Sequence, residues 1–430
     1  MITKNIKTPL MLVVLASLMA LSLLAQVFPT GNVVTKYGAL GNGVHDDTAA
    51  INAAIVASDG ISPVLFPRGS YVVSGPIICG HNAILLGNNT YTSGILLTTP
   101  NAAILFEDGT SFKMKDLALY GSGGATNGLV IGSLTTSGNG AIVEGCLFSG
   151  LGTGINYIKG NTTVFRDCTI IKNGVGYKSG SEFSFTGEYI NLVTFDHCGI
   201  SKNGLGVQLF AGFKPQFVNG CDIEGNTNGA IIVSPVNGHR ISDLSISDSY
   251  FENNSYGSTN TSGQIQFNIG TNLPVLNTSL SRNYFFNSLN TNVASLYLGS
   301  GNYSLVDNDF SVPFGGAIIV SNTPFVVVHG SSTLSDAQAY HDISPNAYFY
   351  NTDSSLGGII TTCAPLANIS WDFYGPTNKG VYTGITKMTY ENGGNGQLVV
   401  NSRLTVNNAA GAKFKMVVNS TTNGFVFVPQ

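Results

Sequence analysis

A repeat in the middle of the chain constrains the fold more than any other feature. Seven segments align without gaps at intervals of 22 to 34 residues, among them "FRDCTIIKNG", "FDHCGISKNG" and "VNGCDIEGN". They share one column of small residues, which consists of Cys146, Cys168, Cys198, Cys221, Ser249, Asn283 and Asn308. The positions three residues before and two residues after this column are apolar in every copy. A unit this short cannot bury its own apolar face, so the copies are expected to stack and share one core.

A second column, of asparagine, follows five residues later at Asn173, Asn203, Asn226 and Asn254. Each copy then continues into a short alternating strand, so one repeat holds three strands separated by turns. The predicted fold is all-β: a right-handed, single-stranded parallel β-helix whose coils are spaced by the ~4.8 Å that separates neighbouring strands. Its asparagines should form an internal ladder of amides, and the small column a row of inward side chains at a tight turn.

Composition and charge support a β-rich protein that does not bind nucleic acid. Charged residues make up only 10% of the chain, and 53 glycines punctuate it, which favours turn-rich strands over long helices. The net charge is −4, and no basic patch would attract nucleic acid. The six cysteines show no spacing typical of a metal site. Because four of them occupy the small column, we expect Cys146, Cys168, Cys198 and Cys221 to be free buried thiols.

The N-terminus has the features of a secretory signal. Lys4 and Lys7 precede an apolar run from Leu10 to Ala25, which is shorter than the ~20 residues of a membrane span. We expect cleavage near Ala25, a secreted or cell-surface protein, and no stable membrane span afterwards; an uncleaved anchor is the alternative. The predicted domains are a signal at 1–25, the β-helix at 26–325 and a β-rich C-terminal region at 326–430. The last of these would be accessory, oligomerising or made of terminal coils.

The stretch "YGALGNGVHDDTAAINAAI", from Tyr37 to Ile55, is followed by "VLFPRGSYVVSGPI". Together they resemble the N-terminal signature of the pectate-lyase-like superfamily, which includes rhamnogalacturonase-like and epimerase-like proteins and phage tailspikes. The resemblance is close over residues 31–74 and extends loosely to about Asn322. It implies a right-handed β-helix that acts on polysaccharides as a hydrolase, lyase or epimerase. The motif is specific for the fold and does not specify the reaction.

The residues of this stretch favour a structural role. Gly41, Gly43 and Asp46 mimic the spacing of a dinucleotide-binding loop, but no alternation of strands and helices follows. Asp46 or Asp47 can instead cap a helix at Thr48–Ala57. A short amphipathic helix here would cover the open end of the stack, where unpaired strand edges invite association.

The best candidate for chemistry is a patch of carboxylates in two successive repeats. In "CDIEGN" and "SYFENN", alternation places Asp222 and Glu224 outward on one strand, about 7 Å apart, with Glu252 one coil further, about 5 Å away. These separations suit hydrolytic pairs of either geometry, and mutual repulsion would raise at least one pKa. Alternatively, the three acids bond turn backbones or hold a structural cation.

Several other residues are candidates for binding a substrate. The segment between Cys168 and Cys198 is longer than its neighbours and would form a loop over one face; its candidates are Glu182, Glu188, Tyr189, Asp196 and His197, with Lys178 and Arg166. His239 and Arg240, in another long connection, could bind a carboxylate. Alternation places four aromatic side chains outward, where sugars could stack on them: Phe210, Tyr250, Tyr284 and Tyr297. Alternatively, the loops or the C-terminal part cover some of these rings. In the C-terminal region, Trp371, Phe373 and Tyr374 are either core residues or carbohydrate contacts.

These patterns predict a secreted enzyme that cleaves glycosidic bonds in a polysaccharide, as a hydrolase or a lyase. Asp222, Glu224 and Glu252 are the predicted catalytic residues. The predicted substrate-binding residues are Glu188, Asp196, His239, Arg240, Tyr250 and Tyr297. No metal ligand is assigned, and Ca²⁺ is the one cofactor left open, because lyases and epimerases neutralise a uronate carboxylate. A homotrimer is also left open. The alternative function is a non-catalytic carbohydrate-binding or adhesive β-helix, since the acid clusters of polygalacturonases and the arginine pattern of pectate lyases are not recognisable.

Overall fold

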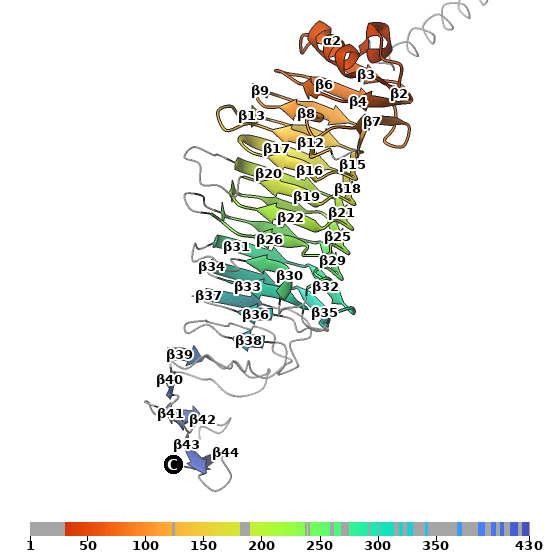
Figure 1. Ribbon diagram of the computed structural model, residues 1–430. Helices are drawn as coiled ribbons and strands as arrows, with labels where there is room; N and C mark the ends of the chain where they lie inside the picture. Colours follow the sequence, from red (N-terminus) through yellow and green to blue (C-terminus); the bar gives the residue numbers. More distant parts are fainter. Residues whose placement is uncertain are drawn as a thin grey trace, which may run out of the picture.

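The structure is a computed structural model (Figure 1). It describes residues 31–122, 125–180, 190–236, 239, 241–258, 262–267, 275–290, 293–299, 301–313, 318–320, 325–329, 340–342, 368–371, 386–391, 397–400, 405–407, 413–419 and 424–429. The predicted signal at 1–25 therefore lies outside the described residues. In the part that is described, no helix has the length and apolar character to cross a membrane.

Three parallel sheets run the length of the stack, as predicted for a right-handed β-helix (Figure 1). Sheet A contains β1 (Asn32–Val33), β3 (Val64–Phe66), β6 (Ile84–Gly87), β10 (Lys113–Lys115), β14 (Ile142–Glu144), β17 (Gly160–Arg166), β20 (Ile190–Asp196), β23 (Gly212–Phe213), β24 (Gln216–Val218), β27 (Ile241–Ser242), β28 (Ser245–Ser247), β31 (Val275–Ser281), β34 (Gly301–Val306) and β37 (Phe325–His329). Sheet B contains β2 (Asn42–Asp46), β4 (Gly69–Val73), β7 (Ser93–Leu97), β11 (Ala118–Gly121), β15 (Leu147–Ser149), β18 (Thr169–Ile171), β21 (Gly199–Ser201), β25 (Asp222–Glu224), β29 (Tyr250–Glu252), β32 (Tyr284–Asn287) and β35 (Asp309–Pro313). Sheet C contains β5 (Pro76–Ile78), β8 (Ala103–Phe106), β12 (Asn127–Ile131), β16 (Thr153–Tyr157), β19 (Val175–Ser179), β22 (Leu205–Leu209), β26 (Ile231–Val233), β30 (Ser262–Phe267), β33 (Val293–Leu298), β36 (Ile318–Val320) and β38 (Tyr340–Asp342).

Each coil contributes one strand or a pair of short strands to sheet A, then one strand to sheet B and one to sheet C. The parallel pairing continues through β37 and β38, beyond residue 325, where the repeat fades in the sequence. A small parallel pair, β9 (Gly109–Thr110) and β13 (Gly138–Asn139), adds to two of the early coils.

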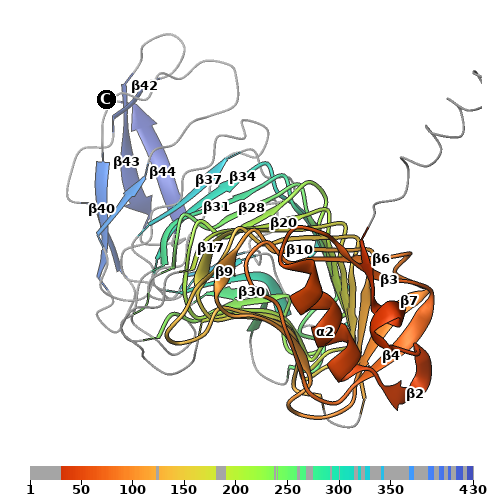
Figure 2. The same ribbon diagram turned by 90° about the horizontal axis from the view of Figure 1, so that it is seen from above.

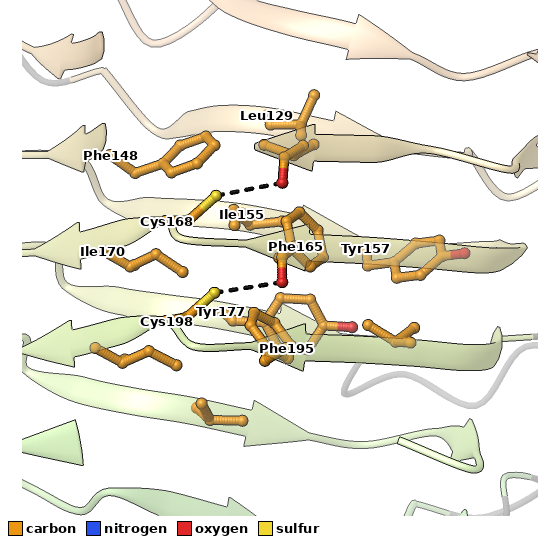
Figure 3. Packing of buried hydrophobic residues seen from close by; sticks show 14 of the residues in the cluster. Leu129, Phe148, Ile155, Tyr157, Phe165, Cys168, Ile170, Tyr177, Phe195 and Cys198 are labelled. Atoms are coloured by element: carbon orange, nitrogen blue, oxygen red, sulfur yellow. Dashed lines mark hydrogen bonds between the residues drawn. The ribbon is translucent and has the colours of Figure 1, made fainter. Parts of the chain in front are cut away.

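The interior follows the predicted columns. Residues of the small column are buried, and the thiols of Cys146, Cys168, Cys198 and Cys221 are free, as predicted. Figure 3 shows the Sγ atoms of Cys168 and Cys198 pointing at carbonyl oxygens of the preceding coil, 3.4 Å from Val143 and 3.3 Å from Phe165. Burial raises the pKa of the Cys146 thiol to about 12. These cysteines therefore act as small core residues rather than as reactive groups. The sixth cysteine, Cys363, lies outside the described residues.

The asparagine column forms the predicted internal ladder. The Asn203 amide nitrogen donates to Oδ1 of Asn226 at 3.0 Å and to the carbonyl of Ile170 at 3.0 Å. Asn226 makes the equivalent bond to Asn254 at 2.8 Å, and that ladder ends on Gln264. Each buried amide therefore satisfies both its neighbour and the turn backbone, which fixes the register between coils.

A helix covers the N-terminal end of the stack, as predicted. The helix α2 (Thr48–Ser58) lies across that end and packs against β1, β3 and β5 (Figure 2); a 3-10 turn, η1 (Val34–Tyr37), packs beside it. The side chain of Asn52 pairs with the first strand of sheet C, donating to the Pro76 carbonyl and accepting from the Ile78 amide, both at 2.9 Å. The helix thus supplies the hydrogen bonds that a further strand would have made.

The paired aspartates before this helix have different hydrogen-bond partners, and each stabilises a different part of the backbone. Asp47 occupies the capping position but makes no capping bond; its carboxylate accepts the amides of Leu40, at 2.8 Å, and Gly41, at 3.0 Å. Gly41 has φ +58, and a Cβ there would meet the Tyr71 ring at 2.8 Å, so only glycine fits this loop. Asp46 instead accepts the amide of Thr48 at 3.1 Å and the Ser74 hydroxyl. The predicted structural role is confirmed, with each aspartate assigned its own partner.

After β38, the described part of the C-terminal region consists of two antiparallel sheets. One contains β39 (Asn368–Trp371), β40 (Thr386–Glu391) and β41 (Gln397–Val400). The other contains β42 (Thr405–Asn407), β43 (Lys413–Asn419) and β44 (Gly424–Pro429). Trp371 ends β39, whereas Phe373 and Tyr374 lie outside the described residues.

Candidate functional site

The outer face of sheet B brings the three predicted carboxylates together. Its strands are short and in register, so every second residue faces outward in a straight column. The pairing of β25 with β29 sets Glu224 directly beside Glu252, and Asp222 beside Tyr250. Ile223 and Phe251, between them, are buried in the core. The predicted placement of Asp222, Glu224 and Glu252 on one outer patch, here called the acid patch, is therefore found in the structure.

The three carboxyl groups of the acid patch differ in their surroundings. Partial burial, and then the charge of Glu252, raise the pKa of Asp222 above its usual value. Burial, Asp222 and Glu252 together raise the pKa of Glu224, while Lys202 opposes this. Glu252 accepts hydrogen bonds from the Tyr250 hydroxyl at 2.8 Å and the Asn253 amide at 3.1 Å. One carboxylate thus accepts two hydrogen bonds, while burial and like charge raise the pKa of the other two, a difference suited to acid–base chemistry.

The coil before the acid patch leaves its outer face nearly bare. Gly199 and Ser201 of β21 lie in register with Asp222 and Glu224. A Cβ added at Gly199 would meet no atom within 4 Å. The side of the acid patch that faces β21 is therefore open to a bound molecule in this column.

The aromatic residues are arranged differently from the prediction. Tyr250 and Tyr284 face outward in successive coils, but their rings stack on each other, with centroids 5.4 Å apart and planes at 5°. Each ring thereby covers one face of the other. Tyr297 is half-buried on sheet C, away from the acid patch. Phe210 is only 6% exposed and lies under the Lys178 ammonium group, 5.4 Å from the ring centroid. Its predicted exposure is wrong, because alternation does not account for side chains that cover the face.

The described members of the second predicted cluster lie on two sheets. Asp196, on sheet A, accepts from Arg166 at 2.9 Å and Asn219 at 2.8 Å. These hydrogen bonds, that from Asn219 first, lower its pKa. Lys178 belongs to sheet C. Glu182, Glu188 and Tyr189 lie outside the described residues. The described members are therefore divided between two sheets, and Asp196 is already paired.

The remaining predicted binding residues are His239 and Arg240. His239 is buried, 7% exposed, so its ring does not line an open surface. Arg240 lies outside the described residues. The sequence reasoning missed the partner of His197: its Nδ1 lies 2.7 Å from Oδ1 of Asp167 in the preceding coil. The signal was present, since both residues hold the same position one before the small column.

Metal coordination has no obvious place in the described part of the chain. There, no group of three or more histidine, cysteine, aspartate or glutamate side chains is arranged to hold a metal ion. The three carboxylates of the acid patch, which are among these residues, are therefore not arranged to hold a metal ion.

Comparisons with known proteins agree with the fold. Residues 31–114 match the family described as "Rhamnogalacturonase A/epimerase, pectate lyase-like", and residues 77–234 match "Right handed beta helix region". The resemblance predicted from the N-terminal stretch is thereby confirmed. The protein is a right-handed parallel β-helix with a pectate-lyase-like N-terminal segment.

Individual relatives extend this result. Mannuronan C5-epimerase AlgE4 of Azotobacter vinelandii is 33% identical over 177 residues, which cover 40% of this chain and 30% of the relative. Alginate lyase 7 of the same bacterium is 31% identical over 197 residues, covering 45% and 22%. The chain thus spans less than a third of either relative. The solved A-module of AlgE4 has a TM-score of 0.56 at 17% identity, covering 80% of this chain and 98% of the module, and so supports the fold alone.

Proposed function

We propose that the protein is a secreted or surface polysaccharide-active enzyme that cleaves glycosidic bonds at the acid patch. The observation that carries the proposal is the pairing of two carboxyl groups of raised pKa, Asp222 and Glu224, with a third, Glu252, that is held by Tyr250 and Asn253. Glycosidic cleavage needs this combination: one neutral carboxylic acid and one carboxylate on the same face.

The roles follow from the surroundings of each group. Glu224 has Asp222 on its own strand and Glu252 in the next coil, so a proton on Glu224 relieves repulsion from both sides. Glu224 would donate this proton to the glycosidic oxygen as the bond to the anomeric carbon breaks. Glu252, which accepts hydrogen bonds from Tyr250 and Asn253, would either take a proton from the attacking water or bond the anomeric carbon itself.

A second candidate function is favoured by the comparisons. The matched relatives are named as a mannuronan epimerase and an alginate lyase, and both reactions begin with removal of a proton beside a uronate carboxylate. For this chain that would make a polyuronate the substrate, with Ca²⁺ as the cation that offsets repulsion between substrate and acid patch. A carbohydrate-binding protein without activity is the third outcome that the experiment must separate.

The test uses the chain from Gln26 onward, incubated with mannuronan, polygalacturonate and neutral glucans, with and without Ca²⁺. Reducing ends alone indicate hydrolysis; reducing ends with absorbance of an unsaturated uronate indicate a lyase; altered sugar configuration by NMR indicates an epimerase. Glu224→Gln and Glu252→Gln should each abolish the activity with the fold intact. Glu144→Gln is the matched control, since Glu144 pairs with Lys115 on sheet A, 2.6 Å away. No signal with any substrate, or full activity in both acid-patch variants, would exclude the proposal.

A further inference from the structure

Beside the acid patch, the corner between sheets B and C carries an exposed aromatic ring without an assigned role. Tyr256 follows β29 by four residues and is 46% exposed, and Leu289, at the same corner one coil later, is 62% exposed. Among the side chains described between residues 214 and 310, these two are the exposed large apolar ones. Exposed apolar groups rimmed by polar ones are characteristic of binding sites.

This corner is rigidly held. The Thr227 hydroxyl, one coil earlier, donates to the Tyr256 hydroxyl at 3.1 Å. The Asn290 amide, one coil later, donates to the carbonyls of Tyr256 at 3.3 Å and Ser258 at 2.8 Å. A Cβ at Gly257 would lie 2.7 Å from Cγ2 of Thr227, so this loop is seated closely on the corner before it. The Tyr256 ring is thus bonded at its hydroxyl from the preceding coil, and its backbone is bonded from the following coil. A ring held in this way loses little conformational freedom when a ligand stacks on it.

The corner is also connected to the acid patch. Asn253 donates to Glu252 at 3.1 Å and accepts the Ser288 amide at 2.9 Å. Ser288 directly precedes Leu289, so one chain of hydrogen bonds leads from Glu252 to the exposed corner. A sugar chain held at Glu252 and extending over this edge of sheet B would reach the Tyr256 ring.

The tyrosines on the acid patch itself are poorly placed for stacking. Tyr250 and Tyr284 cover one another's faces, so a sugar ring lying on the sheet would meet ring edges. Pyranose rings pack their apolar C–H faces on an aromatic face. The single exposed ring of Tyr256 is therefore better placed for stacking on a sugar than the paired rings of Tyr250 and Tyr284.

From these observations we propose that Tyr256 is the floor of a sugar-binding subsite, and that Thr227, Ser258, Leu289 and Asn290 surround it. The ligand is a pyranose unit of the polysaccharide, one or more units away from the bond at the acid patch. This inference rests on the proposed function for the identity of the ligand, and extends it by giving the direction in which the chain leaves the patch. The sugar chain crosses the corner between sheets B and C.

The test is affinity electrophoresis of the Glu224→Gln protein, chosen to prevent turnover, in gels containing mannuronan, polygalacturonate or laminarin. In the gel that retards this protein, adding Tyr256→Ala should weaken binding on the order of tenfold, the loss expected for one aromatic contact. Tyr256→Phe keeps the ring and should bind nearly as well. Tyr91→Ala is the matched control, because Tyr91 is 87% exposed near the other end of the stack. Thermal unfolding of each variant checks that the corner is intact.

The outcomes separate the subsite from the reaction. Unchanged binding in Tyr256→Ala, equal losses in the Tyr256 and Tyr91 variants, or no retardation in any gel would overturn the subsite. If Tyr256→Ala loses binding while Glu224→Gln alone retains turnover, the subsite stands and the proposed catalytic role fails. If Tyr256→Ala binds normally while Glu224→Gln loses turnover, the proposed catalytic role stands and the subsite fails.

Discussion

Two acidic pairs lie in or next to strands of sheet B, and their surroundings are opposite. Asp46 and Asp47, at the N-terminal end, are saturated with donors from Thr48, Ser74, Leu40 and Gly41. Asp222 and Glu224, many coils later, have each other and Glu252 as neighbours. Hydrogen bonds hold the pKa of Asp46 down at about 2, whereas burial and like charge raise the pKa of Asp222 and Glu224. Hydrogen-bond donors thus satisfy the carboxylates that build the fold, whereas burial and like charge raise the pKa of the two carboxylates that we propose for chemistry.

Matched substitutions in the two acidic pairs should differ most in their effect on the rate of turnover. Asp222→Asn should lower the rate about 100-fold or more, because the amide cannot share protons with Glu224. Asp46→Asn, the same change in the structural pair, should leave the rate unchanged. Initial rates on the polysaccharide identified by the panel measure both. Equal loss in both variants would mean that the two pairs do not differ in function.

The next largest effect is on the free energy of unfolding, and it should come from substituting Asp47 in the N-terminal pair. Asp47 is fully buried, so Asp47→Ala leaves the amides of Leu40 and Gly41 without their acceptor. We expect the free energy of unfolding to fall by about 2–4 kcal/mol. Asp222→Ala, at an exposed position, should change it far less. Urea unfolding of the two variants provides the measurement, and a smaller loss for Asp47→Ala than for Asp222→Ala would contradict the assignment.

A smaller effect is the pH dependence of stability. The folded pKa of Asp46, about 2, lies below its ordinary 3.8, so the ionised form stabilises the fold. This stabilisation is complete above about pH 4 and is lost as the pH falls towards 2. Asp46→Asn should therefore flatten the loss of melting temperature across this window. A melting curve of unchanged steepness would show that Asp46 does not contribute.

The smallest effect is a gain in stability when the acid patch is neutralised. For Glu224 the folded pKa is raised, so its ionised form destabilises the fold above that pKa, and the penalty disappears as the pH falls below 4.5. Glu224→Gln should stabilise the protein at neutral pH by roughly 0.2–1 kcal/mol, the scale for like charges on adjacent strands. Below pH 4 the difference from the wild type should vanish. A destabilised Glu224→Gln at neutral pH would indicate that Glu224 is a structural acid like Asp47.

Much of the fold was predictable because the inner columns repeat. A small residue at Cys168 or Cys198 and an asparagine at Asn203 must recur wherever a coil passes the same turn, and recurrence is visible without coordinates. The acid patch was predictable for the same reason: once the columns were aligned, Glu224 and Glu252 had to be neighbours.

Features outside the repeat were not predictable in this way. Phe210 was expected on the surface, but it lies under Lys178. His239 is expected to bind a ligand, but its side chain is buried. Tyr250 and Tyr284 are expected to face outward as platforms for sugars, but their rings stack on each other. Alternation gives the face on which a side chain begins, but it does not show which neighbouring side chain covers it or how two adjacent rings are oriented.

Periodicity and alternation in the sequence were enough to predict the coil and its inner ladders. They also predicted the helix at the N-terminal end and the face that the three carboxylates share. Only the tertiary structure decided what each acid does: Asp47 holds a loop seven residues away, Glu252 is held by Tyr250, and the Tyr256 corner is anchored by Thr227 and Asn290. The reason is that a column assigns a residue to a face, whereas hydrogen-bond partners and pKa depend on the distances at which side chains meet after folding.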